Sequence, residues 1–115
     1  MLAIEEELGS KVGISHALYG LGEVASALGE YQSAREHYKK TLAISEELGR
    51  KDGIASALYG LGKAANSLGE YQIAREYYNR ALNIFKNMGS PNSKIVKESI
   101  DNLDNMNRSK DEPQA

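Results

Sequence analysis

The chain has 115 residues, a formal net charge of −2 and no cysteine. A chain of this length forms one ordinary domain that folds without a metal or a disulfide. Its 14 basic residues are balanced by 16 acidic ones, so it lacks the positive charge with which proteins bind nucleic acid or anionic membranes. The opening segment is acidic and its apolar run is short, which argues against a signal peptide and a membrane span. We therefore expect a cytoplasmic protein that binds neither nucleic acid nor membrane.

The sequence contains the same unit twice, 40 residues apart. ALYGLGEVASALGEYQSAREHYKKTLAISEELG begins at Ala17, and ALYGLGKAANSLGEYQIAREYYNRALNIFKNMG begins at Ala57, with about half of the positions identical. The segment from Leu2 matches the segment from Leu42 at the same offset, so we expect the chain to start in the middle of a repeat. A fixed period of this size indicates stacked supersecondary units rather than one globular core.

Apolar residues recur at steps of three and four within each unit, which predicts two amphipathic helices per repeat. The helices are expected at about residues 1–8, 11–28, 30–48, 52–68, 70–88 and 91–107. The stripe that faces the core in the first full copy consists of Leu18, Leu21, Gly22, Ala25 and Leu28, followed by Tyr31, Ala34, Tyr38, Thr41, Leu42 and Ser45. Glycine ends a helix cheaply because it adopts positive φ. We expect this role for Gly9, Gly29, Gly49, Gly69 and Gly89.

The last helix differs from the others, because it lacks the glycine signature and has one apolar stripe. Ser90 and Pro91 resemble a cap followed by proline at the first helical position. The stripe consists of Ile95, Val96, Ile100, Leu103 and Met106. A helix with one apolar and one polar face is typical of the cap of a repeat array. We divide the chain into a repeat domain (1–107), with a partial repeat (1–13), full repeats (14–53 and 54–93) and a capping helix (91–107), and a disordered tail (108–115).

The repeated residues resemble the tetratricopeptide repeat. That family has Leu-Gly and a small residue in its first helix, Gly-x-Tyr at the turn, and alanine and an aromatic residue in its second helix. The matching residues are Leu18, Leu21, Gly22, Ala25, Gly29, Tyr31, Ala34, Tyr38 and Leu42, and in the second copy Leu58, Leu61, Gly62, Ala65, Gly69, Tyr71, Ala74, Tyr78 and Leu82. The family's usual period is about 34 residues, and its closing proline is replaced here by Glu46 and Lys86. This longer unit resembles the repeats of kinesin light chain.

The resemblance implies an all-α fold, a right-handed superhelix of stacked antiparallel helix pairs. It also implies a protein-protein interaction scaffold, part of a larger repeat protein, that binds a partner peptide or helix in its concave groove. The resemblance places one row of residues on the groove wall: His16, Tyr19, Gly20, Glu23 and Ser26, then Ser56, Tyr59, Gly60, Lys63 and Asn66. Tyrosine brings large contact area with few rotors, and glycine admits close approach of a ligand. The alternative is that Tyr19 and Tyr59 fill the space above Gly60 and Gly20 of the adjoining repeats.

Gly20, Gly22 and Ala25 also match the dinucleotide-binding spacing G-x-G-x-x-A. That motif binds a pyrophosphate only where a strand turns into a helix and leaves N–H groups free. Here it lies inside a helix, so we expect no cofactor, and we interpret Gly22 and Gly62 as packing contacts between helices.

No other pattern indicates catalysis. His16 and His37 fall on different helices without carboxylates at ligand spacing, which argues against a metal site. No serine has a recognisable histidine and acid partner, and no carboxylate pair is marked out as acid and base. We therefore expect a protein that is not an enzyme. The alternative to peptide binding is a homodimer that pairs through the N-terminal helix, whose apolar residues are Leu2, Ile4 and Leu8.

Overall fold

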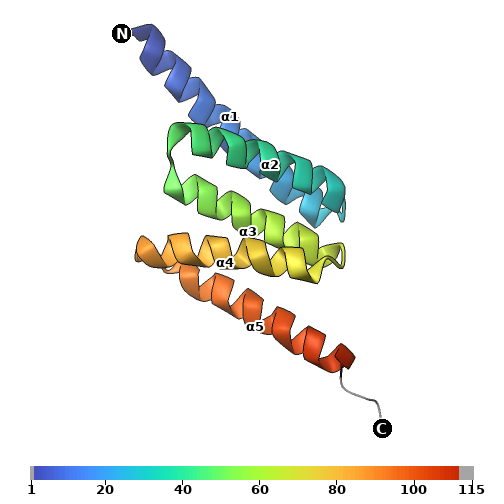
Figure 1. The fold of residues 1–115 in the computed structure, drawn as a ribbon. Coiled ribbons are helices and arrows are strands. Elements are labelled where there is room, and N and C mark those ends of the chain that lie inside the picture. Colours follow the sequence, from blue (N-terminus) through green and yellow to red (C-terminus); the bar gives the residue numbers. More distant parts are fainter. Residues whose placement is uncertain (1, 112–115) are drawn as a thin grey trace.

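The structure is a computed structural model that describes residues 2–111, with side chains described from residue 9 to residue 106. Over this range it contains five helices and no strand: α1 (Leu2–Ala27), α2 (Tyr31–Leu48), α3 (Lys51–Ser67), α4 (Tyr71–Asn87) and α5 (Asn92–Asp111). The helices stack in chain order, each antiparallel to the next, into an elongated body of 68 × 31 × 17 Å (Figure 1). The expected all-α helical repeat fold is confirmed.

Glycines end the helices at four of the five expected turns. Gly29, Gly49, Gly69 and Gly89 have φ angles between 66° and 81°, a region that side chains rarely adopt. At the first turn, the N–H of Glu30 donates to the carbonyl of Ala25 at 2.8 Å, and the equivalent bond recurs at each later turn. These bonds satisfy carbonyl groups that the end of a helix would otherwise leave without a partner.

The helix break expected at Gly9 is wrong, because α1 continues through this residue. The turn at Gly49 joins α2 and α3, which are 18 and 17 residues long and pack against each other. The residues before Gly9 would form a helix of about two turns, which is too short to be stable on its own. Continuing α1 retains the backbone hydrogen bonds, and this outweighs the cost of about 1 kcal/mol for glycine inside a helix.

The core is centred on two tyrosines of the second helices, Tyr38 and Tyr78, which are 0% and 2% exposed. A Cβ atom on Gly22 would lie 2.7 Å from the ring of Tyr38, and one on Gly62 would lie 2.5 Å from the ring of Tyr78. Both distances are too short for real contacts, so the two rings occupy the space that a side chain would take. The interpretation of Gly22 and Gly62 as packing residues is confirmed.

One face of α1 is uncovered, contrary to the expected core stripe. Leu21 is 51% exposed and Leu28 is 68% exposed, whereas Leu61, the counterpart of Leu21 in α3, is 1% exposed. The reason is position in the stack: α2 covers this face of α3, but among the described residues no helix precedes α1. Ile14 and Val24, at 51% and 57% exposure, extend the uncovered stripe.

Helix α5 closes the other end of the stack by packing on α4. Val96 and Leu103 are buried and Ile100 is half-buried, while Ile95 and Met106 of the expected stripe are exposed. The Ser90 side chain accepts a hydrogen bond from the Asn92 N–H at 3.1 Å, as expected of a cap. The tail expected over residues 108–115 is helical over residues 108–111, because α5 runs to Asp111. Residues 112–115 lie outside the described part.

Candidate functional site

The first helices of the stack, α1, α3 and α5, line one face of the molecule. The 40-residue offset continues into α5, so that Tyr19, Tyr59 and Ser99 occupy equivalent positions. The hydroxyl groups of Tyr59 and Ser99 lie 2.8 Å apart and share a hydrogen bond. Two adjoining pockets open on this face, and Tyr19 and Ser56 line both of them.

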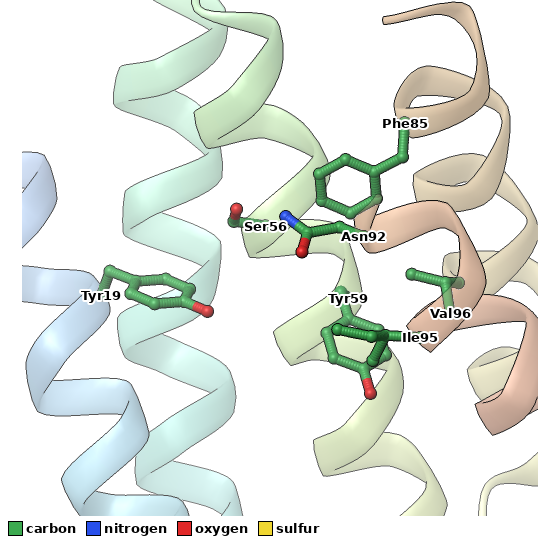
Figure 2. A pocket seen from close by; sticks show the side chains of 7 residues that line it. All are labelled: Tyr19, Ser56, Tyr59, Phe85, Asn92, Ile95 and Val96. Carbon is green, nitrogen blue, oxygen red and sulfur yellow. The ribbon is translucent and has the colours of Figure 1, made fainter. Parts of the chain in front are cut away.

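The first of these, here named the α3–α5 pocket, is mainly apolar and has a volume of about 160 Å³. Figure 2 shows Tyr19 extending from α1 toward α3, with Ser56 and Tyr59 on α3 and the α5 residues opposite. The rings of Tyr59 and Phe85 and the side chains of Ile95 and Val96 supply the apolar surface. Ser56 and Asn92 are the polar residues of the lining.

The second, the α1–α3 pocket, is larger, with a volume of about 310 Å³, and more of the residues in its lining are of polar types. Its lining consists of Ser15, His16, Tyr19, Gly20, Thr41, Asp52, Gly53 and Ser56. Gly20 leaves helix backbone open here, because a Cβ atom at this position would have no neighbour within 4 Å. The backbone of Gly53 instead approaches α2 closely, since a Cβ atom there would lie 2.5 Å from the Ser45 hydroxyl.

Asp52 is the charged residue of the α1–α3 pocket. Burial acts to raise its pKa, but hydrogen bonds from the Arg50 guanidinium and the Gly53 N–H act in the opposite direction, and the pKa is lowered from its ordinary 3.8. Asp52 is therefore a carboxylate at neutral pH. Its ion pair with Arg50 is 3.4 Å long and exposed, and exposed pairs contribute only about 0–1 kcal/mol.

A polar network joins α1, α2 and α3 farther along the same face. The Tyr38 hydroxyl donates to the Glu23 carboxylate, and the Lys63 ammonium lies 3.5 Å from the same carboxylate. Lys63 also lies 5.0 Å from the centre of the Tyr59 ring, which is a cation–π distance. The charges of Glu23 and Lys63 therefore compensate each other.

Burial also changes the acidity of the tyrosines around this network. Desolvation, followed by the charge of Glu23, raises the pKa of Tyr19 to about 12. Desolvation raises the pKa of Tyr78 to about 12, and both desolvation and the hydrogen bond to Glu23 raise the pKa of Tyr38. All three phenols are therefore neutral hydrogen-bond donors throughout the physiological range of pH.

Nine of the ten residues expected on the groove wall fall into three groups in the structure. His16, Tyr19, Gly20, Ser56 and Tyr59 line the two pockets, and Glu23 and Lys63 pair beside them. Ser26 and Asn66 are half-buried and line neither pocket.

Gly60 is not open to a ligand, contrary to the expectation for the groove wall. It is buried, and a Cβ atom on it would lie 2.7 Å from the ring of Tyr38. The ring that covers Gly60 is that of Tyr38 on α2. The alternative interpretation had instead placed the ring of Tyr19 above Gly60. Tyr38 is thus held between Gly22 of α1 and Gly60 of α3.

Sequence reasoning missed the α5 side of the site. Asn92, Ile95 and Val96 line the α3–α5 pocket, but the helix that carries them has almost no identity to the two copies. The signal that could have found them is the register, because a further step of 40 residues from Asp52, Ala55 and Ser56 leads to these three residues. Asp52 itself was missed because it precedes the repeated motif.

Comparison with known proteins identifies the repeats. The profile of a family described as tetratricopeptide repeat matches residues 13–87. A search of curated proteins gave no match. Among the described residues, no cluster of histidine and acidic side chains is arranged to hold a metal ion. None of the helices in the described part has the length and apolar character needed to span a membrane.

Proposed function

We propose that this chain, which belongs to the tetratricopeptide repeat family, binds a peptide segment of a partner protein on the face formed by α1, α3 and α5. Tetratricopeptide repeats generally mediate protein-protein interaction. The observation that carries the proposal is that Tyr19 and Ser56 are common to two adjoining pockets, which makes a continuous groove across three helices. The finer resemblance to kinesin light chain, a scaffold role within a longer array and the absence of enzymatic activity are parts of the same proposal.

Tyrosine rings beside small residues suit such a groove. Tyr19 and Tyr59 are half-buried, and each packs against the core tyrosine of its own repeat, with ring centres 5.7 and 5.6 Å apart. The rings are thereby held in place before a ligand arrives, which lowers the entropic cost of binding. Their remaining exposed surface combines apolar area with a hydroxyl group, a combination that is common at interfaces.

Filling the groove tests the proposal. Ser56 is half-buried and lines both pockets, so Ser56→Leu places a branched side chain where the ligand would lie. We expect it to weaken, by about tenfold or more, the binding of peptides selected on the unchanged chain from a random display library. Fluorescence polarisation with the labelled peptides measures the effect.

The control is Ser33→Leu, because Ser33 is exposed on α2 and lines neither pocket. Both variants are expected to retain the helical circular dichroism of the unchanged chain, since leucine favours helix at least as well as serine. Peptide affinity that is the same for Ser56→Leu and Ser33→Leu would show that binding does not use this groove.

The uncovered stripe of α1 favours a second function, the pairing of two copies. Ile14, Leu21 and Val24 of α1 are exposed, as is Leu28 directly after the helix, and their spacing of seven, three and four residues places them on one side. Such apolar surfaces are often covered by association. The side chains of Leu2, Ile4 and Leu8, which suggested this from the sequence, lie outside the described part. In static light scattering we expect a dimer that becomes a monomer in Leu21→Glu. A monomer for the unchanged chain at high micromolar concentration would contradict this second function.

A further inference from the structure

The two pockets of the groove are lined by different kinds of side chain, and this difference indicates the chemistry of the ligand. The α3–α5 pocket presents Tyr59, Phe85, Ile95 and Val96 around a volume of about 160 Å³. An apolar cavity of about 150 Å³ accommodates benzene. A side chain of the size of phenylalanine or leucine therefore fits this pocket.

The α1–α3 pocket presents hydrogen-bond acceptors and one negative charge. Asp52 is the one residue with a formal charge at neutral pH among those that line either pocket, when histidine is counted as neutral. The hydroxyl groups of Thr41 and Ser56 and the imidazole of His16 add groups that can accept hydrogen bonds. The Asp52 side chain is 59% exposed, and a carboxylate is matched best by a cation that also donates hydrogen bonds to it.

The positively charged side chains near Asp52 leave its carboxylate available to a cation of the ligand. Arg50 contacts Asp52 at 3.4 Å in an exposed pair, and a ligand cation can replace such a weak interaction at little cost. Lys63 lies 3.5 Å from the Glu23 carboxylate and 5.0 Å from the centre of the Tyr59 ring, and it lines neither pocket. Asp52 would therefore repel a ligand carboxylate in the α1–α3 pocket, and no lysine in the lining of this pocket would offset that repulsion.

We infer that the groove recognises a segment of a partner protein in which an apolar side chain, seated in the α3–α5 pocket, lies close in sequence to a lysine or arginine that binds Asp52 in the α1–α3 pocket. Because Tyr19 and Ser56 line both pockets, the two side chains come from neighbouring positions of one segment. This inference rests on the proposed function and adds the chemistry of the ligand to it.

Selection from a random peptide display library on the full chain tests the inference. Two variants each remove one half of the recognition: Asp52→Asn removes the charge, and Ile95→Ser removes apolar surface from a side chain that is 50% exposed. The matched controls are Glu47→Gln, an exposed carboxylate of α2, and Ile73→Ser, a residue of α4 that is 43% exposed. Neither control residue lines a pocket.

Peptides enriched on the unchanged chain are expected to combine phenylalanine, leucine or a similar residue with a nearby lysine or arginine. Asp52→Asn should lower the affinity of these peptides about fivefold, the upper range for an exposed ion pair, and should remove the preference for basic residues while retaining the apolar one. Ile95→Ser should also lower the affinity of these peptides, but it should remove the preference for apolar residues and retain the preference for basic ones. Glu47→Gln and Ile73→Ser should select the same peptides as the unchanged chain.

The possible failures are distinguishable. Enriched peptides that lack basic residues, or that carry acidic ones, would overturn the inference and leave the proposed function in place. Equal reductions of peptide affinity in Asp52→Asn and Glu47→Gln would also overturn the inference and leave the proposed function in place. If the unchanged chain enriched no peptide relative to Ser56→Leu, the proposed function would fail and the inference with it. Circular dichroism of each variant verifies that the fold is retained.

Discussion

Replacing Tyr38 by alanine is expected to lower the free energy of unfolding by about 3–5 kcal/mol, the range for truncating a buried aromatic side chain. Tyr38 is 0% exposed, and its ring lies between Gly22 of α1 and Gly60 of α3. Neither glycine has a side chain that could move into the space left by the ring. Since domains of this size are stable by only about 5–15 kcal/mol, the change removes a large part of the total. Urea unfolding followed by circular dichroism measures it.

Two further variants separate the contributions of the ring and the hydroxyl group. Tyr38→Phe retains the ring but loses the hydrogen bond to Glu23, and we expect it to cost about 1–2 kcal/mol because the acceptor is charged. Tyr31→Ala truncates a half-buried tyrosine of the same helix and should cost less than Tyr38→Ala. A loss of less than about 1 kcal/mol in Tyr38→Ala would show that the ring does not hold the repeats together.

The sequence predicted the elements of the fold because its signals are local. Helical periodicity and glycines that can adopt positive φ act over a few residues, and four such glycines, from Gly29 to Gly89, end helices as expected. The exception is Gly9, whose sequence context is similar to that of Gly49. A turn at Gly49 is stabilised by the packing of α2 on α3, and that contribution is absent from any local pattern.

The candidate site was less predictable, because its residues depend on what each helix packs against. Leu21 and Leu61 occupy equivalent positions, but one is exposed and the other is buried under α2. Ile95 lies beside Tyr59 in the α3–α5 pocket, although the sequence around Ile95 does not resemble the repeat. The period located the groove helices, whereas the pockets depend on contacts between helices.

The two YGLG motifs show the same distinction and lead to opposite expectations for one substitution. Gly20 and Gly60 occupy the same position in their repeats. A Cβ atom on Gly60 would lie 2.7 Å from the Tyr38 ring, whereas one on Gly20 would have no neighbour within 4 Å. Gly20→Ala is therefore expected to stabilise the chain by about 1 kcal/mol through helix propensity. Gly60→Ala is expected to destabilise it by about 2 kcal/mol, since overpacking outweighs the same gain.

A double-mutant cycle identifies the ring as the cause. In the Tyr38→Ala background the methyl group of Gly60→Ala has room, so the second substitution should no longer destabilise, and the coupling free energy should be about 2 kcal/mol or more. Tyr38→Ala should leave the effect of Gly20→Ala unchanged, because Gly20 does not contact that ring. Equal effects of alanine at residues 20 and 60 in the unchanged chain would contradict this explanation. Opposite effects that do not depend on Tyr38 would show that another contact restricts Gly60.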